Sequence, residues 1–221
     1  MDIMLIETIN RKKRQSLIFM LIAFLVFSVY LLVTDENSHL PELVRSVAIT
    51  PSKNIKAVNL VDHNNNLINL EQFKKHWTFV FFGFTNCPDI CPATISQLVQ
   101  VKNGIKGNSQ FKDDFKIFFV SVDPMRDSLE HLKQYMTYFD SSFVGMTGSE
   151  ESILDFEENL GAFHKIETPN SYGGYSVQHT ADVFLINNKG QLVAKFQPPM
   201  NTEKVVKQFF EFVSLQNQIS G

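Results

Sequence analysis

Apolar and polar positions divide the chain into one uninterrupted apolar segment near the N-terminus and a longer region of alternating strand-like and helix-like patterns. Residues 17–33 contain no charged side chain, and Ser28 and Tyr30 are their only polar members. A helix of this length spans about 26 Å, which is close to the roughly 30 Å hydrocarbon core of a bilayer. With Thr34 extending the segment, we expect one transmembrane helix over residues 17–34.

The charges on either side of this segment predict its orientation. Basic residues occupy positions 11–14, whereas Asp35 and Glu36 follow the segment. By the positive-inside rule, residues 1–16 stay in the cytoplasm and the remainder is exported. Residues 28–33 contain no small-x-small cleavage pattern, which favours an uncleaved signal anchor over a cleaved signal peptide. We expect a single-pass protein of the bacterial inner membrane whose C-terminal domain faces the periplasm.

Beyond the anchor, the pattern predicts a tether and then one folded domain. Residues 35–52 are polar and contain Pro41 and Pro51, as is typical of a tether, and residues 53–221 follow as the domain. Roughly 170 residues are enough for one hydrophobic core. A hydrophobic content of 44% is ordinary for a globular protein, and a net charge of −3 offers no basic field for nucleic acid. We therefore expect no nucleic-acid partner.

Strand-like and helix-like segments alternate within this domain. Residues 78–84 and 115–122 are almost continuously apolar, as expected for central strands that are buried on both faces. The other expected elements are hairpins within 56–70 and 183–196, a short strand at 143–146, and helices starting at Pro92, starting at Asp127–Ser128, and covering 153–160 and 205–213. This alternation predicts a mixed α/β domain with a central sheet flanked by helices.

The only two cysteines, Cys87 and Cys91, lie where the first central strand turns into a helix. The N-terminus of a helix stabilises thiolates, and a spacing of four residues places both sulfurs on one helix face. Such a pair can form a redox-active disulfide or bind a soft ion such as Cu(I) or Zn(II). A purely structural disulfide is a weaker interpretation, because so short a loop restrains the unfolded chain little.

A metal site needs a third ligand, and histidine is the natural candidate. His179 precedes a predicted hairpin strand, in a loop that could reach the cysteine turn, and His164 follows a predicted helix. The pattern favours His179 but leaves the choice open, since most histidines are surface or core residues. The six candidates are His39, His63, His76, His131, His164 and His179.

Four separated blocks resemble the SCO/SenC proteins, the copper chaperones of cytochrome c oxidase assembly. They are Phe-Gly-Phe-Thr-Asn-Cys-Pro-Asp-Ile-Cys-Pro at 82–92, Val-Ser-Val-Asp-Pro-Met-Arg-Asp at 120–127, Gly-Met-Thr-Gly at 145–148 and Tyr-Ser-Val-Gln-His-Thr at 175–180. The resemblance runs from about Lys56 to Pro198 and includes the anchor. One departure is Gln178, where the family usually has an acidic residue, so support of the neighbouring histidine is expected to be weaker.

The resemblance implies a thioredoxin-like fold and copper, as Cu(I), Cu(II) or both, bound by Cys87, Cys91 and His179. It also implies a metallochaperone that delivers copper to the binuclear copper site of cytochrome c oxidase subunit II. An alternative is a thiol-disulfide oxidoreductase that reduces the partner's copper-binding cysteines, with a thioredoxin-like protein as reductant for Cys87 and Cys91. Whether the protein is an enzyme therefore stays open. A peroxiredoxin-like peroxidase is less favoured, because Asn86 rather than the expected pocket residue precedes Cys87.

Charged residues near these blocks are expected to have structural roles first and partner docking second. Asp127 is interpreted as a helix cap and Asp123 as a turn residue, and Arg126 can pair with either. Asp89, between the cysteines, is interpreted as a solvent-exposed turn residue.

Overall fold

The computed structural model describes residues 14–28, 40–56, 58–108, 115–168 and 174–220. The chain divides into two compact units, Met1–Pro41 and Glu42–Gly221, which are considered separately.

In the first unit, residues 14–28 form a helix whose apolar side chains are largely exposed, including Phe19 at 75% and Phe24 at 72%. None of the helices within the described ranges combines the length and the hydropathy that crossing a membrane requires. The anchor expected over residues 17–34 continues past residue 28, where the description stops, and most of the segment expected in the cytoplasm also lies outside the described residues. The transmembrane helix and its orientation therefore stay predictions.

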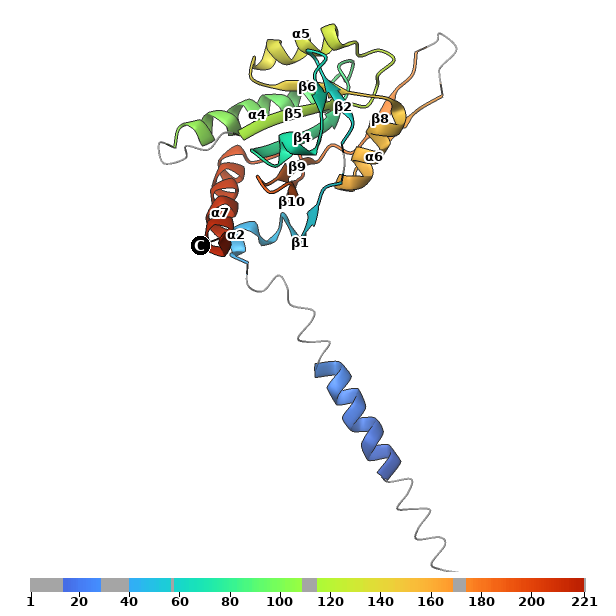
Figure 1. Ribbon diagram of the computed structural model, residues 1–221, viewed down its shortest axis with the longest axis vertical. Helices are drawn as coiled ribbons and strands as arrows, with labels where there is room; N and C mark the ends of the chain where they lie inside the picture. The colour runs from blue at the N-terminus through green and yellow to red at the C-terminus, as the bar shows by residue number, and fades with distance from the viewer. Residues whose placement is uncertain (1–13, 29–39, 57, 109–114, 169–173, 221) are drawn as a thin grey trace, which may run out of the picture. The chain divides into compact units, whose positions relative to one another are not determined.

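The second unit is built on an eight-stranded mixed sheet with the order β1-β10-β9-β4-β5-β6-β2-β3, and a two-stranded ribbon, β7-β8 (Figure 1). The central strands β4, β5 and β6 are parallel to one another, and the other pairs are antiparallel. The strands are β1 Ala48–Asn54, β2 Leu60–Asp62, β3 Leu67–Ile68, β4 Trp77–Gly83, β5 Phe115–Ser121, β6 Val144–Thr147, β7 His164–Ile166, β8 Val177–His179, β9 Val183–Ile186 and β10 Gln191–Phe196.

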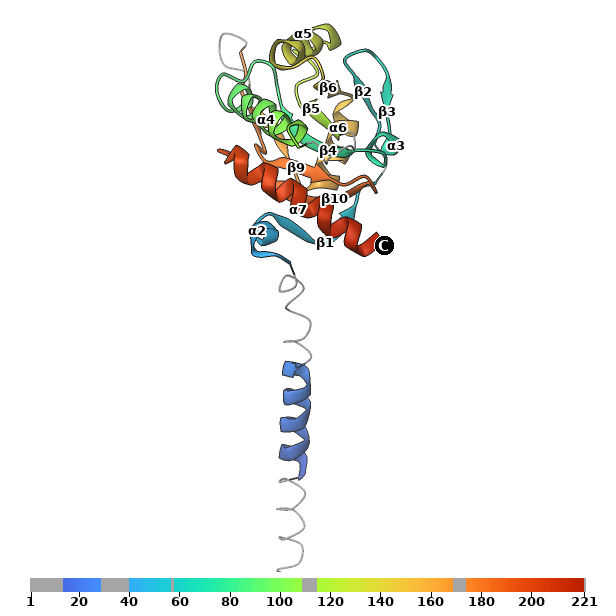
Figure 2. The ribbon, with the colours of Figure 1, turned by 90° about the vertical axis from the view of Figure 1, so that its left-hand side faces the viewer.

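Helices cover both faces of this sheet. The evidence is that every residue of β4 is buried, although its alternate side chains point to opposite faces. On one face Phe79 packs 5.7 Å from Phe209 of α7, and on the other Phe82 packs 5.7 Å from Phe156 of α6, between ring centroids. Figure 2 shows α4 and α7 across the same face. The helices are α2 Glu42–Arg45, α3 Leu70–Phe73, α4 Ile90–Lys106, α5 Leu129–Phe139, α6 Glu150–Leu160 and α7 Thr202–Ser220.

The mixed α/β prediction is confirmed, and the sheet flanked by helices is consistent with the thioredoxin-like fold that the family resemblance implies. The folded unit begins at Glu42 rather than at residue 53, because β1 pairs with β10 through Ala48 and Ala194. This strand lies at the edge of the sheet, and its last five residues are exposed. A polar, solvent-facing edge strand lacks the apolar alternation that marks a strand in sequence, so it resembles a tether.

Candidate metal centre

The two cysteines lie at the carboxyl end of β4, where the chain turns into α4. The Cys87 amide donates a hydrogen bond to the Phe84 carbonyl at 3.2 Å, and the Cys91 amide donates to Cys87 Sγ at 3.4 Å. The helix begins at Ile90, two residues before the expected Pro92, and the Asp89 side chain makes no capping hydrogen bond. The sulfur of Cys87 therefore accepts one of the free amides of the first helical turn. Neither of these two cysteines is part of a disulfide.

The pKa values of the two cysteine thiols are shifted in opposite directions. A hydrogen bond from the Cys91 thiol lowers the pKa of Cys87 to about 5, and backbone amides add to this effect against the opposing influence of burial. The same hydrogen bond, together with burial, raises the pKa of Cys91. At neutral pH the pair consists of one thiolate and one thiol. Cys91 is 0% exposed and Cys87 is 9% exposed, so the thiolate is the sulfur nearer to solvent.

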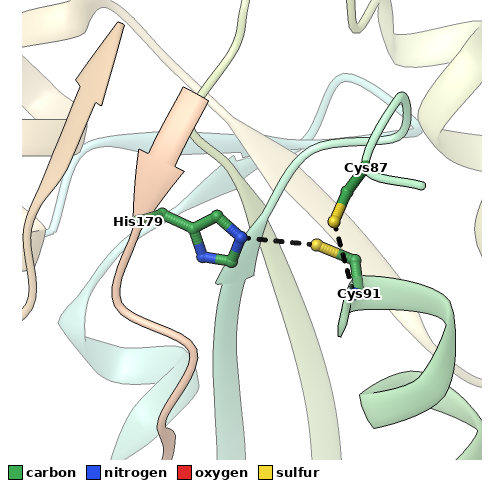
Figure 3. A group of neighbouring side chains, drawn as sticks. All are labelled: Cys87, Cys91 and His179. Carbon is green, nitrogen blue, oxygen red and sulfur yellow. Dashed lines mark hydrogen bonds between the residues drawn. The ribbon is translucent and has the colours of Figure 1, made fainter. Parts of the chain in front are cut away.

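His179 approaches this pair from β8, a segment far away in the sequence (Figure 3). Its Nε2 lies 3.5 Å from Cys91 Sγ, and its Nδ1 donates to the Thr180 carbonyl at 3.0 Å. A carbonyl can only accept, so the proton sits on Nδ1 and the lone pair of Nε2 is directed at the sulfur. The rings of Phe81 and Phe84 pack against the imidazole with centroids at 6.2 and 5.8 Å.

One ligand atom from each of Cys87, Cys91 and His179 lies within 4.8 Å of the other two. The structure thus brings together the three residues that the family resemblance selects. Two sulfurs and one imidazole fit a soft ion, either Cu(I) or Zn(II). The close packing of this site also requires a glycine, because a Cβ added at Gly83 would lie 2.8 Å from Cys91 Sγ.

The other candidate histidines lie elsewhere. His164, on β7, is hydrogen-bonded through Nδ1 to Glu157 Oε2 at 2.8 Å, and this contact raises the pKa of His164. His63 accepts a hydrogen bond from the Gly145 amide at 3.2 Å. His131 is exposed on α5, and His76 precedes β4 at the end opposite the cysteines. His39 lies outside the described residues.

Asp127 is not the helix cap that its position predicts. Its carboxylate is 1% exposed and accepts from the Thr85 amide at 2.9 Å, from Thr85 Oγ1 at 2.5 Å and from Ser121 Oγ at 2.6 Å. The cap of α5 is Ser128, whose side chain accepts from the His131 amide. Asp127 therefore fastens the turn that carries Cys87, and sequence spacing could not distinguish this contact from a cap.

Two further residues depart from their expected surroundings. Asp123 is 0% exposed, pairs with Arg126 and accepts a hydrogen bond at 2.7 Å from the hydroxyl of Tyr175, a residue that sequence reasoning did not single out. Gln178 is exposed and donates to Glu167 Oε1 at 2.7 Å, so its side chain faces away from the three candidate ligands. Asp89 is exposed, as expected.

Comparisons with known proteins agree with this arrangement. A family model described as SCO1/SenC matches residues 49–214. The chain is 29% identical to an SCO2-like protein of Rickettsia prowazekii over 151 residues, which cover 68% of this chain and 72% of the relative.

Solved structures extend the similarity to three dimensions. The apo Sco1 protein of Thermus thermophilus is 32% identical, with a TM-score of 0.65 over 72% of this chain and 91% of its own. Arabidopsis thaliana ScoI with copper bound is 25% identical, with a TM-score of 0.66 over 72% and 98% of the two chains. Yeast Sco1 with copper bound is 26% identical, with a TM-score of 0.67 over 73% and 89%.

Proposed function

Since this chain belongs to the SCO1/SenC family, we propose that it is a copper metallochaperone whose cargo is held by Cys87, Cys91 and His179. The proposed acceptor is the binuclear copper site of cytochrome c oxidase subunit II, which is loaded while the oxidase is assembled. The observation that carries this proposal is the convergence of two sulfurs and one imidazole nitrogen within 4.8 Å. The copper-bound structures of the Arabidopsis and yeast relatives support it.

The protonation states of the three groups suit the uptake of Cu(I). Cys87 is a thiolate at neutral pH because its pKa is lowered to about 5, and the lone pair of His179 Nε2 is free because the Nδ1 proton is held by Thr180. Only Cys91 has to lose a proton when the ion binds. Uptake therefore releases about one proton at neutral pH.

The three ligands differ in burial, and this difference sets the order in which an acceptor can replace them. Cys87 is 9% exposed and His179 is half-buried, whereas Cys91 is 0% exposed. A ligand from the acceptor can therefore replace Cys87 or His179 first, while Cys91 still holds the ion. Copper then passes from protein to protein by ligand exchange, without being released into solution.

We also propose that residues 17–34 anchor the protein in the bacterial inner membrane with the folded domain in the periplasm. Exposed apolar side chains from Leu17 to Phe27 support this, because such a surface is unfavourable in water. The basic residues at positions 11–14 support the orientation. In that compartment the domain would meet the exported part of an oxidase subunit.

A histidine substitution tests the proposed ligand set. His179→Ala should weaken Cu(I) affinity strongly and change the reduction potential of the cysteine pair little. His131→Ala is the matched control, because His131 is exposed on α5. Oxidase assembly in cells that carry either variant as their sole copy should fail for His179→Ala and proceed for the control. Metal analysis of protein purified under reducing conditions should find copper, and a preparation filled with zinc would contradict the proposal.

Thiol-disulfide exchange is the second candidate function, and the hydrogen-bonded thiolate–thiol pair favours it. The Cys87 thiolate would attack a partner disulfide, Cys91 would then release the reduced partner, and two electrons would leave as Cys87 and Cys91 form a disulfide. A thioredoxin-like reductant would restore the pair. If oxidase assembly survives His179→Ala but is abolished by Cys87→Ser, this function replaces the copper-carrying one.

A further inference from the structure

The loop between β5 and α5 contacts both halves of the candidate metal centre. Near its end, Asp127 binds the amide and hydroxyl of Thr85, two residues before Cys87. Earlier in the loop, Asp123 and the residue directly before Asp127, Arg126, bind Tyr175, four residues before His179. One short segment thus connects the cysteine turn to the strand that carries the histidine.

The second of these connections is made by three side chains, Asp123, Arg126 and Tyr175, which we call the tyrosine latch. Arg126 Nη1 donates to the Tyr175 carbonyl at 3.0 Å, and the guanidinium lies 3.8 Å from the centroid of the tyrosine ring. The Tyr175 hydroxyl donates to Asp123 Oδ1 at 2.7 Å, while Arg126 Nε pairs with Asp123 Oδ2. Asp123 is 0% exposed, and its backbone amide donates to Ser121 Oγ at 3.1 Å. The residue that accepts the tyrosine hydroxyl is therefore buried and held through its own backbone.

His179 needs such support because its strand is not part of the eight-stranded sheet. β8 pairs only with β7 among the described strands, through three residue pairs from His164–His179 to Ile166–Val177. An isolated two-stranded ribbon of this length is marginally stable in water. Further fixation of the ribbon comes from the Phe163–Thr180 backbone hydrogen bond at one end and from Tyr175 at the other.

We propose that the tyrosine latch positions His179, holding its Nε2 opposite Cys91 before copper arrives. This inference rests on the proposed function, since it takes His179 as a copper ligand. With the latch broken, the ribbon spends part of its time away from the cysteines, and the apparent dissociation constant rises by the reciprocal of the competent fraction. One lost hydrogen bond of the Tyr175 kind corresponds to roughly a three- to tenfold change in that fraction.

The test compares Tyr175→Phe, which removes only the hydroxyl, with Tyr138→Phe, a change at a tyrosine that is 83% exposed and outside the latch. Cu(I) affinity of the full chain is measured by competition with a chromogenic chelator under anaerobic, reducing conditions. We expect Tyr175→Phe to bind Cu(I) about three- to tenfold more weakly and Tyr138→Phe to match the wild type. Arg126→Lys keeps a charge beside Asp123 but loses the planar fork and the stacking on Tyr175, so it should weaken binding similarly.

A double-mutant cycle shows whether the latch acts through His179. In the His179→Ala background, Tyr175→Phe should weaken Cu(I) binding no further, because there is no imidazole left to position. Amide hydrogen exchange in the apo protein should be faster in residues 176–180 of Tyr175→Phe and unchanged in α4. A merely structural tyrosine would accelerate exchange in both.

The outcomes separate this inference from the function on which it rests. Equal affinities of Tyr175→Phe and wild type, or the same loss with and without His179, would overturn the latch while leaving the ligand set intact. An unchanged affinity of His179→Ala would overturn the ligand set, and the positioning role with it.

Discussion

Replacing Gly83 with alanine perturbs the metal centre from within the sheet. Gly83 is the last residue of β4, and a Cβ there would lie 2.8 Å from Cys91 Sγ and 2.7 Å from Cε2 of the Phe119 ring. Both neighbours are buried, so neither can swing into solvent. The Gly83→Ala protein must therefore move the sulfur, the ring or the strand.

The size of that movement predicts the effect on copper binding. Cys91 Sγ has to retreat by about 0.6 Å to reach an ordinary contact of 3.4 Å. Metal–ligand distances in proteins stay within about 0.2 Å of their standard values, and this displacement is larger than that spread. We expect Cu(I) affinity to fall roughly 10- to 100-fold, the range typical of lost support for a metal ligand. Overpacking should also destabilise the apo protein by about 1–3 kcal/mol.

Competition titration with a Cu(I) chelator measures the first effect, and urea unfolding of the apo protein measures the second. Gly104→Ala is the control, because its Cβ would meet Val206 Cγ2 at 2.7 Å where α4 packs against α7, away from the cysteines. The control should change stability alone. If Gly83→Ala binds Cu(I) as tightly as the wild type, then Cys91 is not held where a ligand is needed and the reasoning is wrong.

Three further predictions concern the groups around the site. Asp127→Asn should destabilise the protein by about 1.5–3 kcal/mol in urea unfolding, because it weakens charge-assisted hydrogen bonds from Thr85 and Ser121. Unchanged stability would show that the buried carboxylate is dispensable. Alkylation of Cys87 by iodoacetamide should rise with pH through about 5 and level off below pH 7, whereas a midpoint near 9 would contradict a stabilised thiolate. Glu157 raises the pKa of His164, so this pair stabilises the fold below the pKa of a free histidine, and the contribution is lost as the pH rises through the folded pKa. The stability difference between wild type and His164→Gln should accordingly shrink as the pH is raised from 5 to 8 in urea titrations, and a difference that grows would contradict the pairing.

The sheet could be predicted from sequence where its strands are apolar on both faces. The runs expected at 78–84 and 115–122 appear as β4 and β5 within one residue, and the expected hairpin after residue 183 appears as β9 and β10. Burial on both sides leaves an almost continuous hydrophobic signal in β4, β5 and β9, whereas in β10 only alternate residues are buried. The exposed edge strand β1 leaves none, which is why residues 48–52 resemble a tether.

The candidate site was predictable only in part, for a related physical reason. Cys87 and Cys91 lie close in sequence, so their spacing brings the two sulfurs together, although Cys87 precedes α4 and does not lie on the helix face that the spacing predicts. Local spacing does not predict where His179 lies relative to the cysteines. Its strand, β8, pairs with β7, and this ribbon meets the cysteines only through tertiary packing. The family resemblance selected His179, and the structure places its Nε2 3.5 Å from Cys91 Sγ.

No pattern in the sequence predicts the polar contacts between residues that lie far apart in the chain. Asp127 lies two residues before α5 and resembles a cap, yet its partner Thr85 is 42 residues away. Tyr175 lies in a block that resembles the family, but nothing local indicates that its hydroxyl meets Asp123, 52 residues away. Buried carboxylates find partners wherever the fold supplies donors, and only coordinates identify them.

X-ray absorption at the copper edge, on the full chain loaded with one equivalent of Cu(I), tests the central claim most directly. The wild type should show two sulfur neighbours and one imidazole nitrogen, and His179→Ala should keep both sulfurs and lose the nitrogen. Identical spectra from the two proteins, or a wild-type spectrum without two sulfurs, would contradict a copper site made by Cys87, Cys91 and His179.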